Sequence, residues 1–351
     1  FRVGHGILDL AASRLGAVFA ASSLNPFLAL GRSAWDDTLG RIEELVRAGV
    51  DIVPLEQATT LLPFTVADYV DFYSSLEHAT NLGRLFRPDG DPLLPNWRHL
   101  PVGYHGRGGT VVVSGTPVVR PCGQAKGTDG PEPRFGPSRW LDIELELGFV
   151  VGVGSRLGES VPGSAFRDHV FGVVLVNDWS ARDIQSWEYQ PLGPFLGKSF
   201  ATSISPWVTP LSLLEGRFVP APAQDPEPLP YLRSAGDWAL DIELEVELSG
   251  TVVSRTNTRG LYWTMPQQLA HATVNGASIR TGDLFASGTI SGPDRGSEGS
   301  LIELTWNGAH PIRIGDGSTR TFLEDGDEVV LRGRAGDVEL GEVRGIVLPA
   351  R

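Results

Sequence analysis

Residues 141–147 read LDIELEL and residues 240–246 read LDIELEV, so the chain contains two nearly identical acidic stretches. Because successive side chains of a β-strand point to opposite faces, each stretch predicts a strand with its carboxylates on one face. Further short strands, separated by Gly, Pro and Asp turns, are predicted after each copy, and helices are few. The clearest predicted strands cover residues 141–153, 170–177, 237–248, 301–306 and 328–332. The sequence therefore predicts a mainly β protein.

The two acidic stretches differ in the residues that come after them. Ser249 and Gly250 come after the second copy as a hairpin-like turn, which predicts a surface ribbon with solvated carboxylates. The first copy continues into the apolar run 148–151, which predicts a buried strand. Adjacent carboxylates entering a buried strand repel one another unless a cation neutralises them. Paired oxygen ligands suit Ca²⁺ or Mg²⁺, so the first copy is the better metal candidate.

Composition excludes several classes of protein. The 351-residue chain has 29 Lys and Arg against 42 Asp and Glu, a formal net charge of −13. That balance argues against duplex nucleic acid as a partner, since binding it needs a basic face. Apolar residues make up 41% of the chain, enough for a core, and no apolar run of about 18 residues predicts a membrane span. Cys122 is the only cysteine, which excludes an intrachain disulfide and favours a reducing cytosol.

Residues 1–60 are predicted to form a small unit of their own. A strand-like start at 2–10 leads to a helix that begins near Ser33 and ends at Gly49. A link punctuated by prolines then leads to the β-rich remainder, residues 61–351.

The segment 71–87, DFYSSLEHATNLGRLFR, predicts a helix with Ser74 and Glu77 as a capping box. His78 then falls in the first turn, where the helix dipole favours the neutral imidazole that a general base needs. Asp71 precedes the helix and could add a third carboxylate, and Arg87 closes the helix. The alternatives are a packed or surface histidine and an arginine that only complements the helix dipole.

The segment 173–198 predicts a fully apolar strand that ends at Asp178, followed by a helix from Ser180 with Asp183 as its capping partner. Site residues often lie at the carboxyl end of a strand. Arg182 and Gln185 are three positions apart and share one helical face. A Pro-rich loop leads to Lys198. The alternatives are a plain turn aspartate and an ordinary surface lysine.

Other catalytic signatures do not occur in the sequence. Leu192 stands where a phosphate-binding loop before Lys198 needs glycine, and neither the Gly-x-Ser-x-Gly spacing nor zinc-ligand pairs of Cys and His are present. Glu303 alternates with the apolar Leu301 in the predicted strand 301–306, and its carboxylate could orient His78.

Six segments together resemble the fumarylacetoacetate hydrolase family. They are DFYSSLEHATN (71–81), LLPNWRHLPVGYHGR (93–107), LDIELELGF (141–149), VNDWSARDIQSWEYQPLGPFLGKS (176–199), YWTMPQQLAHATVNG (262–276) and SGTISGP (287–293). The resemblance runs from about residue 64 to the end. It implies a homodimer whose subunit has a small β-barrel-like N-terminal domain (1–60). A large mixed β-roll or β-sandwich catalytic domain (61–351) would follow.

The resemblance also implies a role for individual residues. A Ca²⁺ or Mg²⁺ ion would be held by Asp71, Glu144, Glu146 and Asp178, and a second metal by Lys198 and Thr202. His78 would activate water, oriented by Glu303, while Arg182, Gln185 and Lys198 would stabilise the oxyanion and the departing enolate. Tyr73, Arg87, Tyr104, Tyr189 and Thr289 would bind the substrate.

The implied activity is metal-dependent hydrolysis of a carbon–carbon bond in 4-fumarylacetoacetate. The products are fumarate and acetoacetate, in the last step of tyrosine and phenylalanine breakdown, and a cytoplasmic location is expected. The partner would be a dianionic diketo acid, with neither nucleic acid nor membrane involved. One alternative keeps the fold but acts on another acylpyruvate or β-diketone. Another, from a different class, is a catalytically silent metal-binding protein of the same fold.

Overall fold

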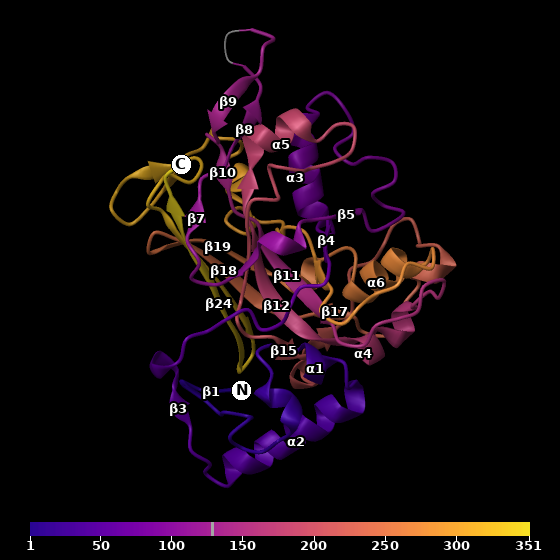
Figure 1. Cartoon of the computed structure of the whole chain (residues 1–351). Coiled ribbons are helices and arrows are strands. Elements are labelled where there is room, and N and C mark those ends of the chain that lie inside the picture. Colours follow the sequence, from indigo (N-terminus) through magenta and orange to yellow (C-terminus); the bar gives the residue numbers. More distant parts are fainter. Residues whose placement is uncertain (128–129) are drawn as a thin grey trace.

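The computed structural model describes residues 1–127 and 130–351, and strands dominate it (Figure 1). Two large sheets lie face to face, and most helices sit around their edges and ends. The α-helices of the described residues are α1 (Asn25–Leu28), α2 (Arg32–Arg47), α3 (Leu76–Phe86), α4 (Phe166–His169), α5 (Arg182–Glu188), α6 (Met265–Thr273) and α7 (Leu301–Leu304). The predicted mainly β class is confirmed.

The larger sheet is mixed and carries the strands that matter for function. Its order is β5 (Gly103–His105), β4 (Tyr69–Phe72), β20 (Leu284–Ala286), β11 (Leu145–Val151), β12 (Val170–Asp178), β14 (Thr202–Ile204) and β6 (Val111–Val113), and β15 (Thr209–Pro210) also pairs with β12. Neighbours are antiparallel except β4 with β20 and β6 with β14. Every residue of β11 and β12 is buried, which explains their apolar runs without alternation.

A second sheet packs on the first and closes the main core. Its order is β19 (Thr251–Asn257), β18 (Glu243–Leu248), β23 (Glu328–Ala335), β24 (Val338–Leu348) and β7 (Val118–Val119). Leu145, Leu147 and Phe149 of the first sheet share one apolar cluster with Leu244 and Val246 of the second. Each fully buried side chain of this size contributes about 1.5–3 kcal/mol. The predicted sandwich is therefore held together mainly by this layer.

The opposite face of the larger sheet is covered by α1 and α2. Phe27 and Trp35 belong to one apolar cluster with Val174 and Phe171, and the Trp35 and Phe171 rings lie 5.3 Å apart, edge to face. The helix predicted near Ser33 begins at Arg32. The rest of this unit is a three-stranded sheet of β1 (Arg2–Val3), β2 (Gly6–Ile7) and β3 (Val53–Pro54). A barrel-like N-terminal domain is not confirmed, and the boundary at residue 60 stays a prediction.

Three predicted strands differ in the structure. Residues 301–306 are not a strand, because Leu301–Leu304 form α7 with Ser300 as its N-cap residue. The predicted strand 141–153 is broken: β10 (Leu141–Asp142) pairs with β13 (Ser180–Ala181), and β11 starts only at Leu145. The strand 237–248 is likewise divided into β17 (Ala239–Leu240) and β18. All four residues of α7 are buried, so the side chains show no helical alternation of polar and apolar positions.

The predicted caps of α3 and α5 are also wrong. Ser75, not Ser74, caps α3, and its Oγ accepts a hydrogen bond from the backbone N–H of His78. Ser74 Oγ instead accepts from Gln268 Nε2 at 2.9 Å. Helix α5 begins at Arg182, and the Asp183 carboxylate accepts bonds from outside the helix rather than capping it. In both cases a tertiary contact takes the side chain that the sequence pattern assigns to the cap.

The remaining strands form small two-stranded sheets. These are β8 (Cys122–Ala125) with β9 (Arg134–Pro137), β16 (Phe218–Val219) with β17, and β21 (Ile312–Arg313) with β22 (Thr319–Arg320).

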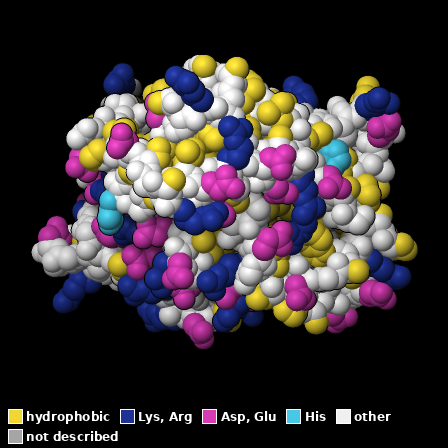
Figure 2. Space-filling view, turned by 90° about the horizontal axis from the view of Figure 1, so that it is seen from below, with side chains coloured by type: hydrophobic (Ala, Val, Ile, Leu, Met, Phe, Trp, Pro, Cys, Tyr) yellow, Lys and Arg dark blue, Asp and Glu magenta, His cyan; other side chains and the backbone are white. Residues whose placement is uncertain are grey.

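No helix in residues 1–127 and 130–351 is long and apolar enough to cross a bilayer. The face on the side of the N-terminal unit carries acidic and basic side chains interspersed, without a large patch of one sign (Figure 2).

Candidate active site

Four buried carboxylates gather within the larger sheet. Asp71 lies on β4, Glu146 on β11 and Asp178 at the end of β12, while Glu144 lies in the break between β10 and β11. Each residue offers one oxygen, and these four atoms all lie within 4.8 Å of one another. None of the four residues is more than 4% exposed. The carboxylates predicted as metal ligands are thus brought together.

The residues of this cluster fit a hard divalent cation. Asp71 Oδ1 and Glu146 Oε1 are buried and have no hydrogen-bond partner among the described residues. Burial and the neighbouring carboxylates raise the pKa of both groups well above their ordinary values. A bound cation would supply the missing partner and favour the ionised forms. Because the four acidic donors are oxygens, Ca²⁺ or Mg²⁺ suits them better than a metal that prefers sulfur or nitrogen.

Two fixed cations lie beside the same cluster. The buried Lys198 ammonium donates to Glu144 and, at 2.9 Å, to Asp178 Oδ2, so an ordinary surface position for Lys198 is wrong. Arg182 Nη1 lies 2.6 Å from Glu144 Oε1, and Thr202 Oγ1 donates to Asp178 Oδ1 at 2.8 Å. Burial alone would raise the pKa of Glu144, but Lys198 and Arg182 outweigh it and lower that pKa. Glu144 therefore stays ionised.

A buried histidine–glutamate pair lies next to the carboxylates. His78 Nδ1 is 2.6 Å from Glu303 Oε2, and His78 Nε2 is 4.0 Å from Glu144 Oε1. An ionised carboxylate can only accept, so the contact assigns a proton to Nδ1, and in the neutral imidazole the lone pair is then on Nε2. The Tyr73 ring packs edge to face against His78, with centroids 5.2 Å apart. In that form, Nε2 would present its lone pair to the space beside the cluster.

Three residues that sequence reasoning missed hold Glu303 in place. Asn81 Nδ2 donates to Oε1 at 3.0 Å, while the hydroxyls of Ser291 and Ser300 donate to Oε2 at 3.0 and 2.6 Å. Burial alone would raise the pKa of Glu303, but His78, Ser300 and Asn81 lower it. Ser300-x-x-Glu303 is a capping-box pattern, and Asn81 follows His78 by one helical turn. Both patterns are present in the sequence. They indicate contacts with Glu303 only if residues 301–304 are helical, which the predicted strand over 301–306 excludes.

Arg182 and Gln185 share one face of α5, as predicted. Arg182 Nη1 donates to Gln185 Oε1 at 3.2 Å, and Arg182 Nε donates to Asp142 Oδ2 at 2.8 Å. Arg182 Nη2 is buried and has no partner among the described residues. The strong opposing charges of Glu144 and Asp142 offset the effect of burial and raise the pKa of Arg182. The guanidinium is therefore a permanent cation with one free donor nitrogen.

Two of the predicted substrate-binding residues point unpaired polar atoms into buried space. Tyr104 lies opposite Asp71 in the antiparallel β4–β5 pair, and its hydroxyl has no partner among the described residues. Thr289 is 1% exposed, and its Oγ1 is also without a partner there. Buried hydroxyls normally have hydrogen-bond partners, so both are candidates for contact with a bound molecule.

Of the other three predicted substrate-binding residues, Tyr73 and Arg87 are half-buried and Tyr189 is exposed. Burial raises the pKa of Tyr73 strongly, and Arg87 is near enough to offset part of that rise. Arg87 closes α3 and its Nη2 donates to the Pro92 carbonyl at 2.6 Å, while its buried Nε has no partner among the described residues. Tyr189 is 43% exposed, and its hydroxyl accepts from Gln190 at 3.1 Å. Tyr189, the residue that follows α5, is therefore exposed and does not lie among the buried groups.

The loop after α5 delivers Lys198 to the carboxylates. Glu188 Oε1 accepts from the backbone N–H groups of Phe195 and Gly197 at 2.9 and 2.7 Å, which folds the loop back on the helix. A Cβ atom on Gly197 would lie 2.7 Å from the backbone nitrogen of Gln185. Only glycine allows this close approach. The loop is therefore fixed at the residue immediately before Lys198.

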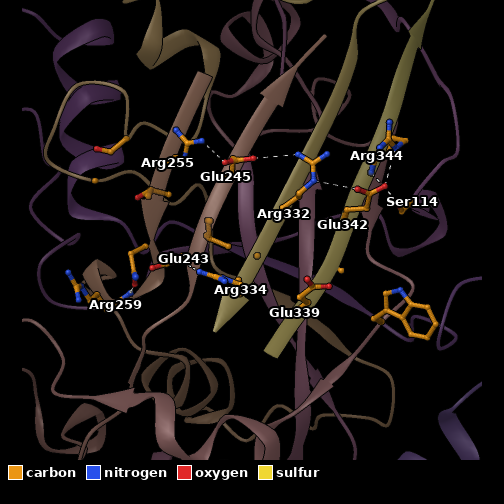
Figure 3. Close-up of a pocket in the computed structure, with 18 of the residues that line it drawn as sticks. Ser114, Glu243, Glu245, Arg255, Arg259, Arg332, Arg334, Glu339, Glu342 and Arg344 are labelled. Atoms are coloured by element: carbon orange, nitrogen blue, oxygen red, sulfur yellow. Dashed lines mark hydrogen bonds and ion pairs between the residues drawn. The ribbon is translucent and has the colours of Figure 1, made fainter. Parts of the chain in front are cut away.

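The second acidic stretch lies on the outer sheet, as the sequence predicts. Glu243 and Glu245 line a groove of about 1410 Å³, where arginines of neighbouring strands face them (Figure 3). Glu245 contacts Arg255 at 2.9 Å and Arg332 at 3.5 Å, and Glu243 contacts Arg334 at 3.4 Å. These acidic groups have protein cations as partners, so this copy has no unpaired cluster like the first.

Comparison with known proteins agrees with this geometry. Residues 68–347 match the sequence model described as "Fumarylacetoacetate (FAA) hydrolase C-terminal". The chain belongs to the fumarylacetoacetate hydrolase family. Within that family, it is 50% identical over 380 residues to the fumarylacetoacetase of Rattus norvegicus and 48% identical to that of Homo sapiens. In both cases, 99% of this chain and 91% of the relative are covered.

More distant relatives and solved structures extend the comparison. The fumarylacetoacetase of Dictyostelium discoideum is 44% identical over 360 residues, covering 95% of this chain and 84% of that protein. The crystal structure of maleylpyruvate hydrolase from Sphingobium sp. SYK-6 aligns with a TM-score of 0.59 and 18% identity, covering 100% of this chain and 96% of the other. The fumarylacetoacetate hydrolase fold is therefore shared well beyond the range of close sequence similarity.

Proposed function

We propose that this chain hydrolyses the carbon–carbon bond of 4-fumarylacetoacetate to give fumarate and acetoacetate. The observation that carries the proposal is the buried His78–Glu303 pair beside four carboxylates that lie within 4.8 Å of one another. High identity to proteins named fumarylacetoacetase, over nearly the whole chain, supports the same substrate. The proposed pathway context is the last step of tyrosine and phenylalanine breakdown.

His78 is the proposed general base. Its Nε2 lone pair takes a proton from water, whose oxygen attacks one carbonyl of the substrate. Glu303 fixes the imidazole tautomer through Nδ1 and stabilises the imidazolium that forms. The bond to the neighbouring carbon then breaks, the electron pair leaves as an enolate, and the imidazolium proton can return to that carbon. General-base catalysis of this kind contributes about 10²–10⁴-fold.

Arg182, Gln185 and Lys198 are proposed to stabilise negative charge as it develops. The unpaired Arg182 Nη2 is a ready donor for an oxyanion, and Gln185 lies beside it. Removal of one such donor typically costs about 3 kcal/mol of transition-state stabilisation. The proposed substrate contacts are Tyr73, Arg87, Tyr104, Tyr189 and Thr289. Among these, Arg87 is the suited partner for a substrate carboxylate, since a guanidinium can bind one bidentately.

A divalent ion is the proposed cofactor, with Asp71, Glu144, Glu146 and Asp178 as its ligands. When bound, such an ion supplies Lewis-acid polarisation of substrate oxygens. We propose Ca²⁺ or Mg²⁺. The second metal site at Lys198 and Thr202 stays a prediction, and Asp178 and Glu144 raise the pKa of the Lys198 ammonium against the effect of burial. The ammonium therefore stays protonated and pairs with these two carboxylates. The homodimer and the cytoplasmic location also stay predictions.

The test is loss of the ultraviolet absorbance of fumarylacetoacetate when the purified protein is added. We expect turnover by the unaltered protein, and a large loss with a chelator or with His78→Ala. Restoration by Ca²⁺ or Mg²⁺ after chelation would separate metal removal from unfolding. No turnover by the unaltered, metal-loaded protein would overturn the substrate assignment. Turnover of other acylpyruvates instead would favour the alternative of a same-fold hydrolase, and metal binding without turnover would favour the silent protein.

A further inference from the structure

Asp142 is the one acidic residue of LDIELEL that the metal cluster does not use. It lies on β10, whereas the strand breaks after it and β11 resumes at Leu145. The break turns Asp142 away from the cluster of Glu144 and Glu146, although the three residues alternate in sequence. Asp142 is fully buried, so its carboxylate needs partners of its own.

Besides the adjacent Ile143 N–H, which donates to Oδ1 at 2.8 Å, the partners of Asp142 come from two separate elements. Arg182 Nε at the start of α5 donates to Asp142 Oδ2 at 2.8 Å. The backbone N–H groups of Leu301 and Ile302, in the first turn of α7, donate to Oδ1 and Oδ2 at 2.7 and 3.1 Å. One carboxylate thus joins the guanidinium that faces Glu144 to the turn that carries Glu303.

We propose that Asp142 is a positioning residue, which holds Arg182 and the Glu303-bearing turn in a fixed relation to each other. The inference rests on the proposed function for its catalytic consequence. A four-residue helix has little rigidity of its own, so an external acceptor for its first N–H groups fixes its position. An error of about 1 Å in such a placement can cost about 10²-fold in rate. Asp142 touches neither the carboxylate cluster nor, in this proposal, the substrate.

The negative charge of Asp142 is part of the argument. Both of its oxygens accept bonds, from a guanidinium on one element and from backbone N–H groups on the other. An asparagine has nearly the same shape but presents an NH₂ group to at least one of these donors. Asp142→Asn therefore removes the charge and at least one of the accepted bonds, which weakens the link between the two elements, while the volume of the side chain stays nearly unchanged.

The second acidic stretch supplies a matched control. Asp241 holds the same place in LDIELEV, but its side chain is half-buried and accepts from Asn257 Nδ2 at 2.7 Å. It contacts neither α5 nor α7 in the described structure. Asp241→Asn makes the same chemical change in the same local sequence, without the link that the proposal needs.

The experiment compares Asp142→Asn and Asp241→Asn with the unaltered protein. For Asp142→Asn we expect kcat and kcat/KM for fumarylacetoacetate to fall together by about 10- to 100-fold, as for loss of an outer-shell partner. Ca²⁺ affinity, measured by calorimetry, should stay within about threefold, since the four ligands are intact. Amide hydrogen exchange at Leu301 and Ile302 should become faster. Asp241→Asn should change none of these.

A double-mutant cycle with Arg182→Ala distinguishes positioning from general destabilisation. If Asp142 acts partly through Arg182, the double variant loses less activity than the product of the two single losses. Independent losses that multiply, or unchanged kcat and exchange in Asp142→Asn, would overturn the proposal. If Asp142→Asn does not fold, Arg182→Gln tests the link from its other end: faster exchange at Leu301 and Ile302 supports it, and unchanged exchange overturns it. Failure of the unaltered protein to turn over the substrate would instead overturn the proposed function, and the exchange and Ca²⁺ measurements would still decide the link.

Discussion

Glu144 and Glu146 lie two positions apart on one short segment, yet their surroundings shift their pKa values in opposite directions. Burial raises both, but Lys198 and Arg182 lower the pKa of Glu144, whereas Asp71 and Asp178 raise that of Glu146 further. At the scale of residues, these two carboxylates are therefore electrostatically different. One carboxylate is neutralised by the protein, and its neighbour depends on an added cation.

This difference predicts the behaviour of Glu146→Gln. Without metal, we expect the variant to be at least as stable as the unaltered protein, because a costly buried carboxylate is replaced by a neutral amide. The rise in Tm on addition of Ca²⁺ should be much reduced, because a ligand is lost. Thermal unfolding in chelator and in Ca²⁺ measures both effects. Glu245→Gln, at the equivalent place in the second stretch, should show neither. A destabilised Glu146→Gln protein in chelator would contradict the argument.

Asp283, which is not part of the carboxylate cluster, offers a pH-dependent prediction. It is 4% exposed, Arg280 N–H donates to its Oδ2 at 2.8 Å, and burial raises its pKa to about 6. A carboxyl group whose pKa is higher in the folded than in the unfolded state contributes stability that is fully present at a pH below its unfolded-state pKa. That contribution is lost as the pH rises through about 6. Asp283→Asn removes the titration and keeps an acceptor for Arg280. In urea unfolding, the free energy of unfolding of Asp283→Asn relative to that of the unaltered protein should increase between about pH 4 and pH 7. A difference that does not change with pH would contradict this.

At the scale of elements, short segments position the reactive groups more than long ones do. Helix α7 has four residues and carries Glu303, and the loop between α5 and β14 carries Lys198. Neither segment has enough internal hydrogen bonds to be rigid alone, so both depend on contacts from outside. Ser300, Ser291 and Asn81 fix Glu303, and Glu188 fixes the loop.

The loop predicts a strong effect of Gly197→Ala. The added Cβ would lie 2.7 Å from the backbone nitrogen of Gln185 and 2.9 Å from its Cα. Both atoms belong to the backbone of α5 and cannot turn away as a side chain can, so the loop must move. We expect Lys198 to shift from Glu144 and Asp178, and kcat to fall by about 10²-fold. Steady-state kinetics measures this. Gly216→Ala is the control, since nothing lies within 4 Å of its Cβ position. Equal activity of both variants would show that the loop adapts.

At the scale of the whole molecule, the larger sheet packs against other elements on both of its faces. One face meets the second sheet in the main core, and the other meets α1 and α2 near the N-terminus. Helices α3 and α5, which flank the candidate site, lie at the far end from α2 (Figure 1). Packing of the N-terminal unit and chemistry at the site are therefore separate in space.

Trp35→Ala tests the second interface. The side chain is 6% exposed, contacts Phe171 and donates from Nε1 to the Leu28 carbonyl at 3.1 Å. Its truncation should lower the free energy of unfolding by about 3–5 kcal/mol, with kcat nearly unchanged. Leu30→Ala, at a position 54% exposed, should change stability by less than about 0.5 kcal/mol. One cooperative transition is expected in denaturant. A separate early transition for the variant, with the main one unmoved, would show that residues 1–60 unfold on their own.

Much of the site was predictable from local sequence. The paired carboxylates before a buried apolar run indicated a cation site, and the end of an apolar strand indicated Asp178. The helix spacing also placed Arg182 beside Gln185. These predictions rest on alternation along a strand and on periodicity along a helix, which local backbone geometry alone enforces.

The sequence by itself thus determined the β class, the buried first copy and the exposed second copy of the acidic stretch. Only the tertiary structure decided that Ser75 rather than Ser74 caps α3, and that Asp142 faces Arg182 rather than the four clustered carboxylates. The physical reason is that a buried polar group takes whichever partner the packed chain brings to it. Such partners can lie far along the chain, as Ile302 does at 160 positions from Asp142 and Gln268 at 194 positions from Ser74, and no local pattern encodes them.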